Sequence, residues 1–536
     1  MKKYLSIAFA ALALAACAEK IDDTNDPALN GEIEQSYIAI NLMSADPDTR
    51  AEGDSYEDGD AAERKVNTVH FFFFRQGAPF PVNATGTAPG GNKNWLLSTL
   101  NGVSEERETA NISDYSNAVL VLNNYKGQYP DKIVAVINSS PAEKAYTLGE
   151  LHSQLTSLKG NGEGFVMSNS VYLSEDSKIV DATSIAAANI KTTPGDALAA
   201  PVDIYVERLA AKVKVTEKQQ KFDTENTIGG NKVFVRVDNW SLYNANPSSY
   251  LLKNISTAWT NEGLGFTWND SPYYRSYWAD AGLGTVSNNV NWTDGVAVDG
   301  VAVDGVDYCG ENTDPVAADR TKVVLKGQLV NEAGDAVELV KWNGQEMIGK
   351  ESLMTAAASQ LQYTLYTSVT DGEQVTRTQI SKDDIQCVAG TDASAPTGIK
   401  SYQVFFQLSS TGDDKTWVKS VEGNYTGMSV EEVNTYLKEN LSPAIVYTEG
   451  KTFYYLDIRH LGNAAEKPGY YGVVRNHVYN IAINSIKGYG IPVYDPATEI
   501  EDLEYPSEEE EVYVAAKINV LAWRVVNQEV NVTPQN

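Results

Sequence analysis

The chain has 536 residues, of which 42% are apolar and 10% aromatic, with 40 Gly and 19 Pro. This length suits two to four domains, and the composition is that of a globular protein rather than of collagen, a coiled coil or a disordered chain. Asp and Glu outnumber Lys and Arg by 71 to 42, which gives a net charge of −29. Such a charge repels phosphate backbones and anionic lipid surfaces, so it argues against a nucleic-acid partner.

The chain begins with the pattern of a lipoprotein signal peptide, residues 1–16. Two lysines precede an apolar run over residues 4–16, which is too short to span a bilayer as a helix. Residues 14–17 (LAAC) place small residues before a cysteine, as lipoprotein signal peptidases require. We therefore predict that Cys17 is lipidated and, with two or three acyl chains such as palmitate, anchors the precursor to a membrane. The alternative is a cysteine that merely lies near a general cleavage site.

Residues 17–50 are predicted to be a propeptide that contains the first strand. Residues 36–45 have a strand pattern, with Ile38, Ile40 and Leu42 among its apolar members. A polar stretch with Asp and Gly follows this strand. One cut in that stretch would release the strand from the rest of the chain.

The predicted cut lies between Arg50 and Ala51. Arg50 is the single arginine of the polar stretch, so a trypsin-like protease would cut after it. Arg64 offers a second possible cut, but it adjoins the strand that starts at Val66 and should be less accessible.

Strand patterns dominate the rest of the chain. They are rich in Val, Ile, Phe and Tyr, often alternate with a period of two, and are separated by Gly, Asn, Asp and Pro clusters. These patterns favour a mainly β fold of the β-sandwich type with few helices. The predicted strands are 66–74, 119–122, 133–137, 204–215, 233–242, 323–330, 402–408, 453–458, 474–486 and 512–532.

Short helices and one domain boundary can also be placed. Capping boxes at 140–143, 147–150 and 429–432 predict three short helix starts. A polar break with a Gly-Gly pair at 217–231 separates two strand-rich halves. We therefore predict an N-terminal β-sandwich domain over 51–225 and a C-terminal one over 226–498.

The sequence contains no recognisable catalytic motif. It has four histidines without an HExxH pair, and it lacks GxSxG, P-loop and CxxC patterns. We predict no enzyme activity, no cofactor and no metal site. Acidic residues are abundant enough that two of them would serve a glycosidase, but abundance alone does not indicate one. The aromatic cluster at 273–278 would stack on a sugar, although tyrosines in a β protein more often fill sheet faces.

Two further features have more than one interpretation. Cys309 and Cys387 would be able to pair in an oxidising compartment, but their spacing does not show that they do. Residues 294–307 repeat VAVDG, which would bring Asp side chains to a calcium ion, yet neither EF-hand nor nonapeptide spacing is present. A flexible surface loop is the favoured interpretation.

The chain ends in a strand pattern on an acidic tether, residues 499–536. From Glu499 to Glu511 eight of thirteen residues are acidic, and a linker that repels itself does not pack. The long strand pattern over 512–532 follows it. One parity of this pattern is mostly apolar, with Gln528 as an interruption.

These features together resemble the shaft subunits (fimbrillins) of the type V pili of Bacteroidia, and the minor fimbrial type of Porphyromonas in particular. The acidic segment after Cys17 is similar to the export signal of surface lipoproteins of the Bacteroidetes. The resemblance covers most of the chain, and the VAVDG repeat lies outside it. Its motifs are 14–17 (LAAC), 131–138 (DKIVAVIN), 207–213 (ERLAAKV), 275–278 (RSYW), 473–481 (VVRNHVYNI) with 490–492 (GIP), and 520–523 (VLAW).

The resemblance implies two transthyretin-like β-sandwich domains and assembly by donor-strand exchange. The lipoprotein would reach the cell outer membrane, an Arg-specific protease would cut between Arg50 and Ala51, and the first strand would leave. A strand from a neighbouring subunit would fill the vacated groove, which would build an extracellular fimbria for adhesion and biofilm formation. Partners would be further pilin subunits, tip and anchor pilins. The expected donor-strand residues are Val520, Ala522, Trp523, Val526, Val530 and Val532.

Three alternatives stay open. The last strand would instead belong to its own sandwich. A non-polymerising surface lipoprotein, such as a pilus tip, an anchor or a glycan-binding adhesin, would keep its N-terminal segment or lack a functional C-terminal strand. A surface hydrolase would need a pocket that holds paired carboxylates.

Overall fold

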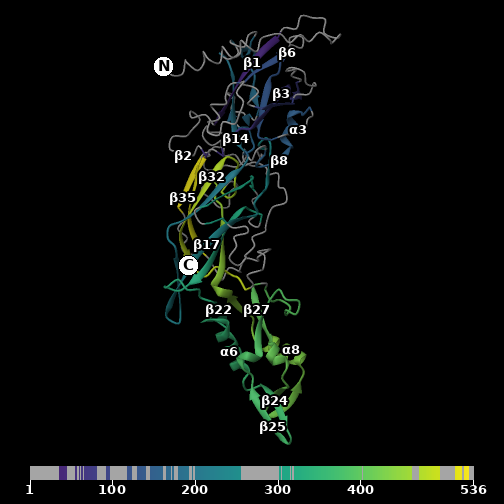
Figure 1. Ribbon diagram of the computed structural model, residues 1–536, viewed down its shortest axis with the longest axis vertical. Coiled ribbons are helices and arrows are strands. Elements are labelled where there is room, and N and C mark those ends of the chain that lie inside the picture. Colours follow the sequence, from purple (N-terminus) through teal and green to yellow (C-terminus); the bar gives the residue numbers. More distant parts are fainter. Residues whose placement is uncertain are drawn as a thin grey trace.

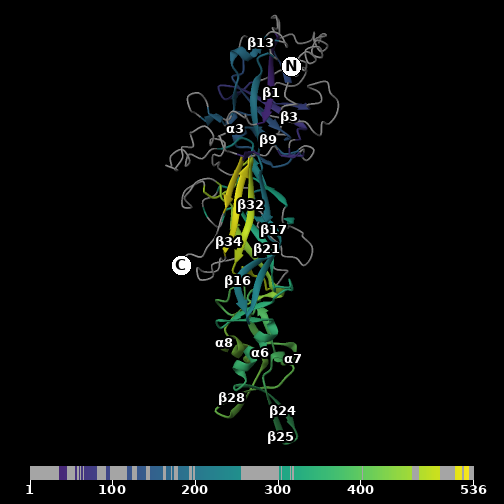
Figure 2. The same ribbon diagram turned by 90° about the vertical axis from the view of Figure 1, so that its left-hand side faces the viewer.

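The computed structural model describes residues 35–44, 55–80, 92–96, 118–123, 129–139, 145–254, 301–460, 470–494 and 513–529, with short gaps inside several of these ranges. The described residues form many strands and few, short helices, so the mainly β fold is confirmed. Figures 1 and 2 show three units along the long axis: a large N-terminal sheet, a middle sandwich and a smaller unit with helices.

The N-terminal unit is one large sheet with both faces covered. Its strand order is β13-β1-β14-β9-β7-β3-β4, while β6 pairs with β1, β5 with β3 and β12 with β7. Its strands are β1 (Gln35–Ser44), β3 (Thr68–Arg75), β4 (Ala78–Pro79), β5 (Asn92–Leu96), β6 (Ala118–Asn123), β7 (Lys132–Ile137), β9 (Met167–Asn169), β12 (Thr183–Ser184), β13 (Ile190–Lys191) and β14 (Val202–Arg208).

Strand β3 shows how the sequence produces this arrangement. Successive side chains of a strand point to opposite faces. Phe71 and Phe73 therefore enter one apolar core, and Phe72 and Phe74 enter the core on the other face. A continuous apolar run, rather than alternation, is what a strand buried on both faces requires.

The predicted strand 204–215 is two strands that belong to different units. β14 ends at Arg208 in the N-terminal sheet, and β15 (Ala211–Glu217) begins in the middle sandwich. Leu209 and Ala210 between them are fully buried. The apolar pattern continues through these two residues, so the sequence does not show where β14 ends and β15 begins.

The middle unit is a sandwich of two six-stranded sheets. One sheet has the order β2-β35-β34-β32-β15-β20, and the other has the order β16-β17-β21-β31-β33 with β19 on β17. Buried side chains of both sheets, among them Trp240, Tyr454 and Tyr479, form a shared core. The remaining strands are β2 (Ser55–Tyr56), β16 (Phe222–Ile228), β17 (Asn231–Tyr243), β19 (Val301–Ala302), β20 (Val306–Cys309), β21 (Lys322–Val330), β31 (Lys451–Asp457), β32 (His477–Lys487), β33 (Ile491–Pro492), β34 (Tyr513–Leu521) and β35 (Arg524–Glu529).

The third unit is inserted between β21 and β31. Its five-stranded sheet, β23-β22-β30-β27-β26, packs with α6 (Lys350–Leu361) and α8 (Val430–Asn440) around a separate core, and α7 (Ser410–Asp413) contacts β27. A four-stranded sheet, β25-β24-β28-β29, lies beyond it at the end of the molecule (Figure 2). These strands are β22 (Leu339–Trp342), β23 (Gln345–Ile348), β24 (Leu365–Asp371), β25 (Gln374–Gln379), β26 (Ile385–Ala389), β27 (Gln403–Leu408), β28 (Trp417–Val421), β29 (Asn424–Met428) and β30 (Ala444–Tyr447). The unit lies inside the predicted domain 226–498, and the predicted domain limits stay a prediction.

Two of the predicted helix starts are observed. In α3 (Leu148–His152) the Thr147 side chain accepts a hydrogen bond from the Glu150 backbone, and the Glu150 side chain accepts one from the Thr147 backbone. Ser429 and Glu432 make the same reciprocal pair at α8. The third predicted start, at 140–143, lies outside the described residues. Two small sheets complete the fold: β8 (Leu155–Ser157) with β18 (Ser248–Tyr250), and β10 (Tyr172–Leu173) with β11 (Ile179–Val180).

The predicted strand 512–532 is not one strand. β34 ends at Leu521, and β35 runs back along it from Arg524, so the two form an antiparallel hairpin. β34 thus pairs with β32 along one edge and with β35 along the other. Alternation of apolar residues predicts strands but does not show where one strand folds back on itself.

Candidate functional site

Strand β1, which the sequence marks as the releasable strand, has neighbours on both edges. Tyr37 lies opposite Lys191 of β13 on one edge and Val121 of β6 on the other. Ile40 lies opposite Val202 of β14 and Ala118 of β6 in the same way. Removal of β1 would therefore leave an open slot between β6 on one side and β13 and β14 on the other.

The core next to this slot is apolar. Val202, Ile204 and Val206 of β14 are buried in one of the two cores of the N-terminal sheet. They alternate along the strand that pairs in parallel with residues 40–44 of β1. A strand that enters the slot would gain backbone hydrogen bonds from both edges and apolar contacts from this core.

The residues predicted for processing are placed as follows. Ile38, Ile40 and Leu42 all lie in β1. Cys17, Arg50 and Ala51 lie outside the described residues, as does Arg64. The predicted cut at Arg50 falls between the end of β1 at Ser44 and the start of β2 at Ser55.

The residues predicted for the donor strand are divided between two strands. Val520 belongs to β34 and Val526 to β35, and the hairpin places them directly opposite each other. The parity pattern predicted that they follow one another along a single strand, but they lie on two strands. Ala522, Trp523, Val530 and Val532 lie outside the described residues.

The C-terminal hairpin pairs within its own subunit. β34 is matched to β32 from Val478 opposite Leu521 to Lys487 opposite Tyr513. β35 pairs with β34 and, on its outer edge, with β2, where Ser55 lies opposite Val525 and Tyr56 opposite Arg524. In the first sheet of the sandwich, β35 thus lies beside β2, the strand that follows the predicted cut, and β34 lies on the other side of β35 (Figure 1).

Glu63 is a buried acidic residue that joins this segment to both large units. Its Oε1 lies 2.6 Å from Lys212 Nζ and accepts a hydrogen bond of 2.6 Å from the Tyr308 hydroxyl. Its backbone carbonyl accepts a 2.7 Å hydrogen bond from Arg208 Nε. Arg208 ends β14 in the N-terminal sheet, whereas Lys212 and Tyr308 belong to β15 and β20 of the sandwich. Burial, with the hydrogen bond to Glu63, raises the pKa of Tyr308 above its usual range.

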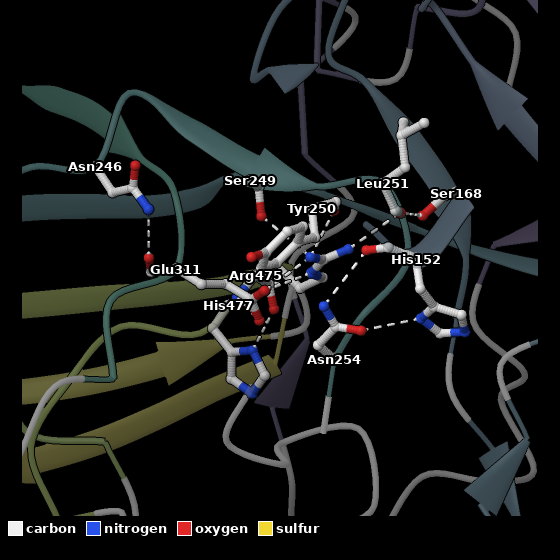
Figure 3. A network of polar contacts seen from close by, with 10 residues as sticks. All are labelled: His152, Ser168, Asn246, Ser249, Tyr250, Leu251, Asn254, Glu311, Arg475 and His477. Carbon is white, nitrogen blue, oxygen red and sulfur yellow. Dashed lines mark hydrogen bonds and ion pairs between the residues drawn. The ribbon is translucent and has the colours of Figure 1, made fainter. Parts of the chain in front are cut away.

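Arg475, from the motif at 473–481, is the centre of a second buried network (Figure 3). Its guanidinium lies 2.8 Å from Glu311 Oε2, and both side chains are almost completely buried. Its Nη2 also donates to the Tyr250 carbonyl at 2.8 Å and to Ser249 Oγ at 3.1 Å. His477 Nδ1 donates to the Arg475 carbonyl at 2.7 Å. This polar centre therefore fixes the start of β32, the strand on which the C-terminal hairpin rests.

The same network reaches the N-terminal sheet through residues 249–254. Ser168 of β9 donates a hydrogen bond to the Leu251 carbonyl, which also accepts from Arg475 Nη1 at 3.4 Å. His152 of α3 donates through Nδ1 to Asn254 Oδ1 at 3.1 Å. Figure 3 shows these contacts side by side, so the sheet and the sandwich are joined by buried polar groups as well as by the chain.

Lys253 is a further buried charge beside this network. Lys253 is buried close to Glu207, Glu311 and Arg475. Burial lowers the pKa of Lys253, while the two carboxylates oppose that shift. Such buried charges are tolerated because they face opposite charges and hydrogen-bond partners.

The sequence did not single out Glu63, Glu311 or Lys253 as functional residues. Lys212 and Arg475 lie inside quoted motifs, but the motifs did not reveal their partners. Glu63 stands 145 positions before Arg208 and 245 positions before Tyr308. A single sequence carries no signal for contacts at such separations.

His460, His477 and the two described cysteines lie within packed parts of the structure. His460 Nδ1 lies 2.9 Å from the Tyr479 hydroxyl, beside His477 in the sandwich. Cys309 and Cys387 are not bonded to each other, and they lie in β20 and β26 of different units. Burial raises the pKa of the Cys387 thiol to about 12. Among the described residues no group of three His, Cys, Asp or Glu side chains is arranged to hold a metal ion.

His70 of β3 predicts a stability change in mild acid. Burial lowers its pKa from 6.5 to about 4. Below pH 6.5 the unfolded chain therefore binds a proton at His70 that the folded chain takes up only near pH 4, so the free energy of unfolding falls as the pH drops through this window. We expect His70→Leu to reduce that fall. Melting temperatures of both proteins between pH 7 and pH 4 provide the test, and equal slopes would contradict the prediction.

The described part of the chain contains no helix that is long and apolar enough to cross a membrane.

A comparison with known protein families agrees with the resemblance to fimbrillins. Residues 445–529 match the family described as major fimbrial subunit protein type IV, fimbrillin, C-terminal. The matched residues cover β31 to β35 and include the motif at 473–481. No curated protein matches the chain.

Solved structures of low similarity were also found. A fimbrilin from Porphyromonas gingivalis is 14% identical, with 92% of this chain and 98% of that chain covered and a TM-score of 0.38. A "putative cell adhesion protein" from Parabacteroides distasonis is 13% identical, with 93% and 98% covered and a TM-score of 0.36. Another of the same description from Bacteroides eggerthii is 11% identical, with 94% and 100% covered and a TM-score of 0.34.

Proposed function

We propose that this protein is a structural shaft subunit of a surface fimbria that polymerises by protease-triggered donor-strand exchange. The fimbrillin match supports the role of a fimbrial subunit. The observation that carries the strand-exchange mechanism is the position of β1, an interior strand that one cut between β1 and β2 would detach. A subunit that loses an interior strand exposes two sheet edges, which are templates for a strand from another chain.

The C-terminus supplies the second component of this mechanism. β35 is the last described strand and lies next to the edge strand of its sheet, so its departure would break its pairing with β34 and β2 and leave β34 paired with β32. We infer that β35, which lies within the segment predicted to be the donor strand, would insert into the slot of the next subunit. Before the cut, β1 occupies the slot at a very high effective concentration and prevents polymerisation.

The precursor would be carried to the cell outer membrane by a lipid on Cys17 and matured there by an Arg-specific protease. Copies of this chain, together with tip and anchor pilins, would be its partners in an extracellular fimbria for adhesion and biofilm formation. The protein would act as a structural component and not as an enzyme, without a cofactor.

Limited proteolysis tests this proposal. The lipid-free precursor, starting after Cys17, is treated with a trace of trypsin, and the new N-terminus is sequenced. The untreated and the treated protein are then compared by size-exclusion chromatography and electron microscopy. We expect a new N-terminus at Ala51 and SDS-resistant ladders or fibres. An N-terminus at Ala51 on a protein that stays monomeric would contradict strand exchange.

A second candidate function is a non-polymerising surface lipoprotein, such as a pilus tip, an anchor or a glycan-binding adhesin. The observation that favours it is the C-terminal hairpin, since β34 is fully paired with β32 in its own sandwich. This candidate predicts that the hairpin stays in place after the cut, and the proteolysis experiment distinguishes the two.

A further inference from the structure

The outer strand of the C-terminal hairpin is held much less firmly than the inner one. β34 has nine paired positions with β32, from Val478 to Lys487. β35 has four paired positions with β34 and a single one with β32, at His477 opposite Arg524. The strand that can leave the subunit is therefore β35, with β34 as the part that remains.

A two-residue strand covers the outer edge of β35. Ser55 and Tyr56 of β2 pair with Val525 and Arg524, at the beginning of β35. No strand lies outside β2 in the described part of this sheet. An uncovered sheet edge is a template for pairing with other chains, so β2 both stabilises β35 and blocks its first residues.

Glu63, which follows β2 along the chain, is held by residues far from β35. Its carboxylate is bound by Lys212 of β15 and Tyr308 of β20, which lie toward the opposite edge of the same sheet. Its backbone is further fixed by Arg208 and by Asp60, whose Oδ1 accepts from the Glu63 amide at 2.9 Å. Glu63 is 1% exposed, so this anchor is buried.

The length of chain between the two contacts fits this arrangement. β35 and β15 are separated by three strand spacings, or about 14 Å. Seven residues from Tyr56 to Glu63 reach at most about 25 Å when extended. The number of residues between β2 and Glu63 is therefore sufficient to connect the edge of the sheet with the anchor.

We propose that β2 and the buried Glu63 together form a clasp that keeps β35 on its own subunit. The clasp lies after the predicted cut, so it becomes the mature N-terminus and stays anchored by Glu63 when β1 leaves. A cleaved subunit must then separate β35 from β2 before this strand can pair with a second copy. Because of the clasp, the release of β35 from its own subunit is a separate step that follows cleavage. Its biological meaning rests on the proposed strand exchange, but the clasp itself is a property of the single subunit.

Hydrogen exchange on the uncleaved, lipid-free monomer tests the clasp independently of polymerisation. Proline cannot donate to a strand ladder, so Ser55→Pro combined with Tyr56→Pro removes the pairing, whereas Ser55→Ala with Tyr56→Ala keeps the backbone donors. We expect amide exchange in β35 to become about tenfold faster in the proline variant, since a tenfold change corresponds to about 1.4 kcal/mol, or one to three backbone hydrogen bonds. Exchange in β32 should not change, and the alanine variant should behave as the unmodified protein.

Glu63→Gln provides a second variant that leaves β2 intact. The amide cannot balance the charge of Lys212, so we expect faster exchange in β35 here as well, by a smaller factor. Unchanged β35 exchange in both the proline and the Gln variants would overturn the clasp.

Polymerisation after cleavage separates the clasp from the proposed function. If strand exchange operates, the cleaved proline variant should form fibres faster than the cleaved alanine variant, and equal rates would overturn the role of the clasp in donor release. If neither protein polymerises while β35 exchange still differs between them, the clasp stands and strand exchange fails.

Discussion

Replacing Arg475 by Met should destabilise the protein by about 3 to 5 kcal/mol, the usual cost of leaving a buried charge without its partner. Arg475 is completely buried and lies 2.8 Å from the equally buried Glu311. The substitution would also leave the Tyr250 carbonyl without the guanidinium donor. Denaturant unfolding, followed by circular dichroism and by hydrogen exchange in β32, measures the loss in the middle unit.

A matched variant on the surface separates this effect from the general loss of an arginine. Arg236 pairs with Asp238 at 2.6 Å, but its side chain is 44% exposed. We expect Arg236→Met to cost less than about 1 kcal/mol, as exposed ion pairs do. Adding Glu311→Leu to Arg475→Met should restore part of the stability, because the stranded carboxylate is then removed. Equal losses for the buried and the exposed arginine would contradict the proposed role of the network.

Two variants that each fail to polymerise should together form a defined heterodimer. Arg50→Ala should keep β1 in its slot and retain the donor strand. Deletion of residues 522–536 should remove the donor strand, and cleavage of that variant should open the slot. Because strand exchange needs one slot and one donor strand, the mixture has one productive pairing.

The experiment cleaves the deletion variant first, stops the protease, and then adds the Arg50→Ala variant. Native mass spectrometry should show a 1:1 complex, while each protein alone remains monomeric. The uncleaved deletion variant serves as the control and should form no complex, since β1 still fills its slot. Fibres from either variant alone, or a complex with the uncleaved control, would show that assembly does not use this exchange.

Much of the fold follows from local sequence patterns. The four phenylalanines at 71–74 and the alternation in 453–458 predict strands because the period of side-chain direction is a local property of the backbone. The capping boxes at 147–150 and 429–432 predict the starts of α3 and α8 for the same reason, since each box closes within four residues. The motif at 473–481 indicated the fimbrillin resemblance, which the match over 445–529 confirms.

The functional arrangement depended on contacts that no local pattern encodes. The apolar pattern at 204–215 gave one strand, yet burial of Leu209 and Ala210 between two units divides it into β14 and β15. The pattern at 512–532 likewise gave one strand, and pairing with β32 and β2 folds it into a hairpin.

The sequence by itself determined the class of fold, the strand that precedes the predicted cut and the strand-rich C-terminus, because side-chain periodicity and caps act within a few residues. Only the tertiary structure decided that β1 is an interior strand, that β35 pairs with β2 at the edge of its sheet, and that Glu63 is bound by residues up to 245 positions away. The physical reason is that strand partners and buried ion pairs are chosen by the packing of the whole chain, where charges must find opposite charges once they leave water.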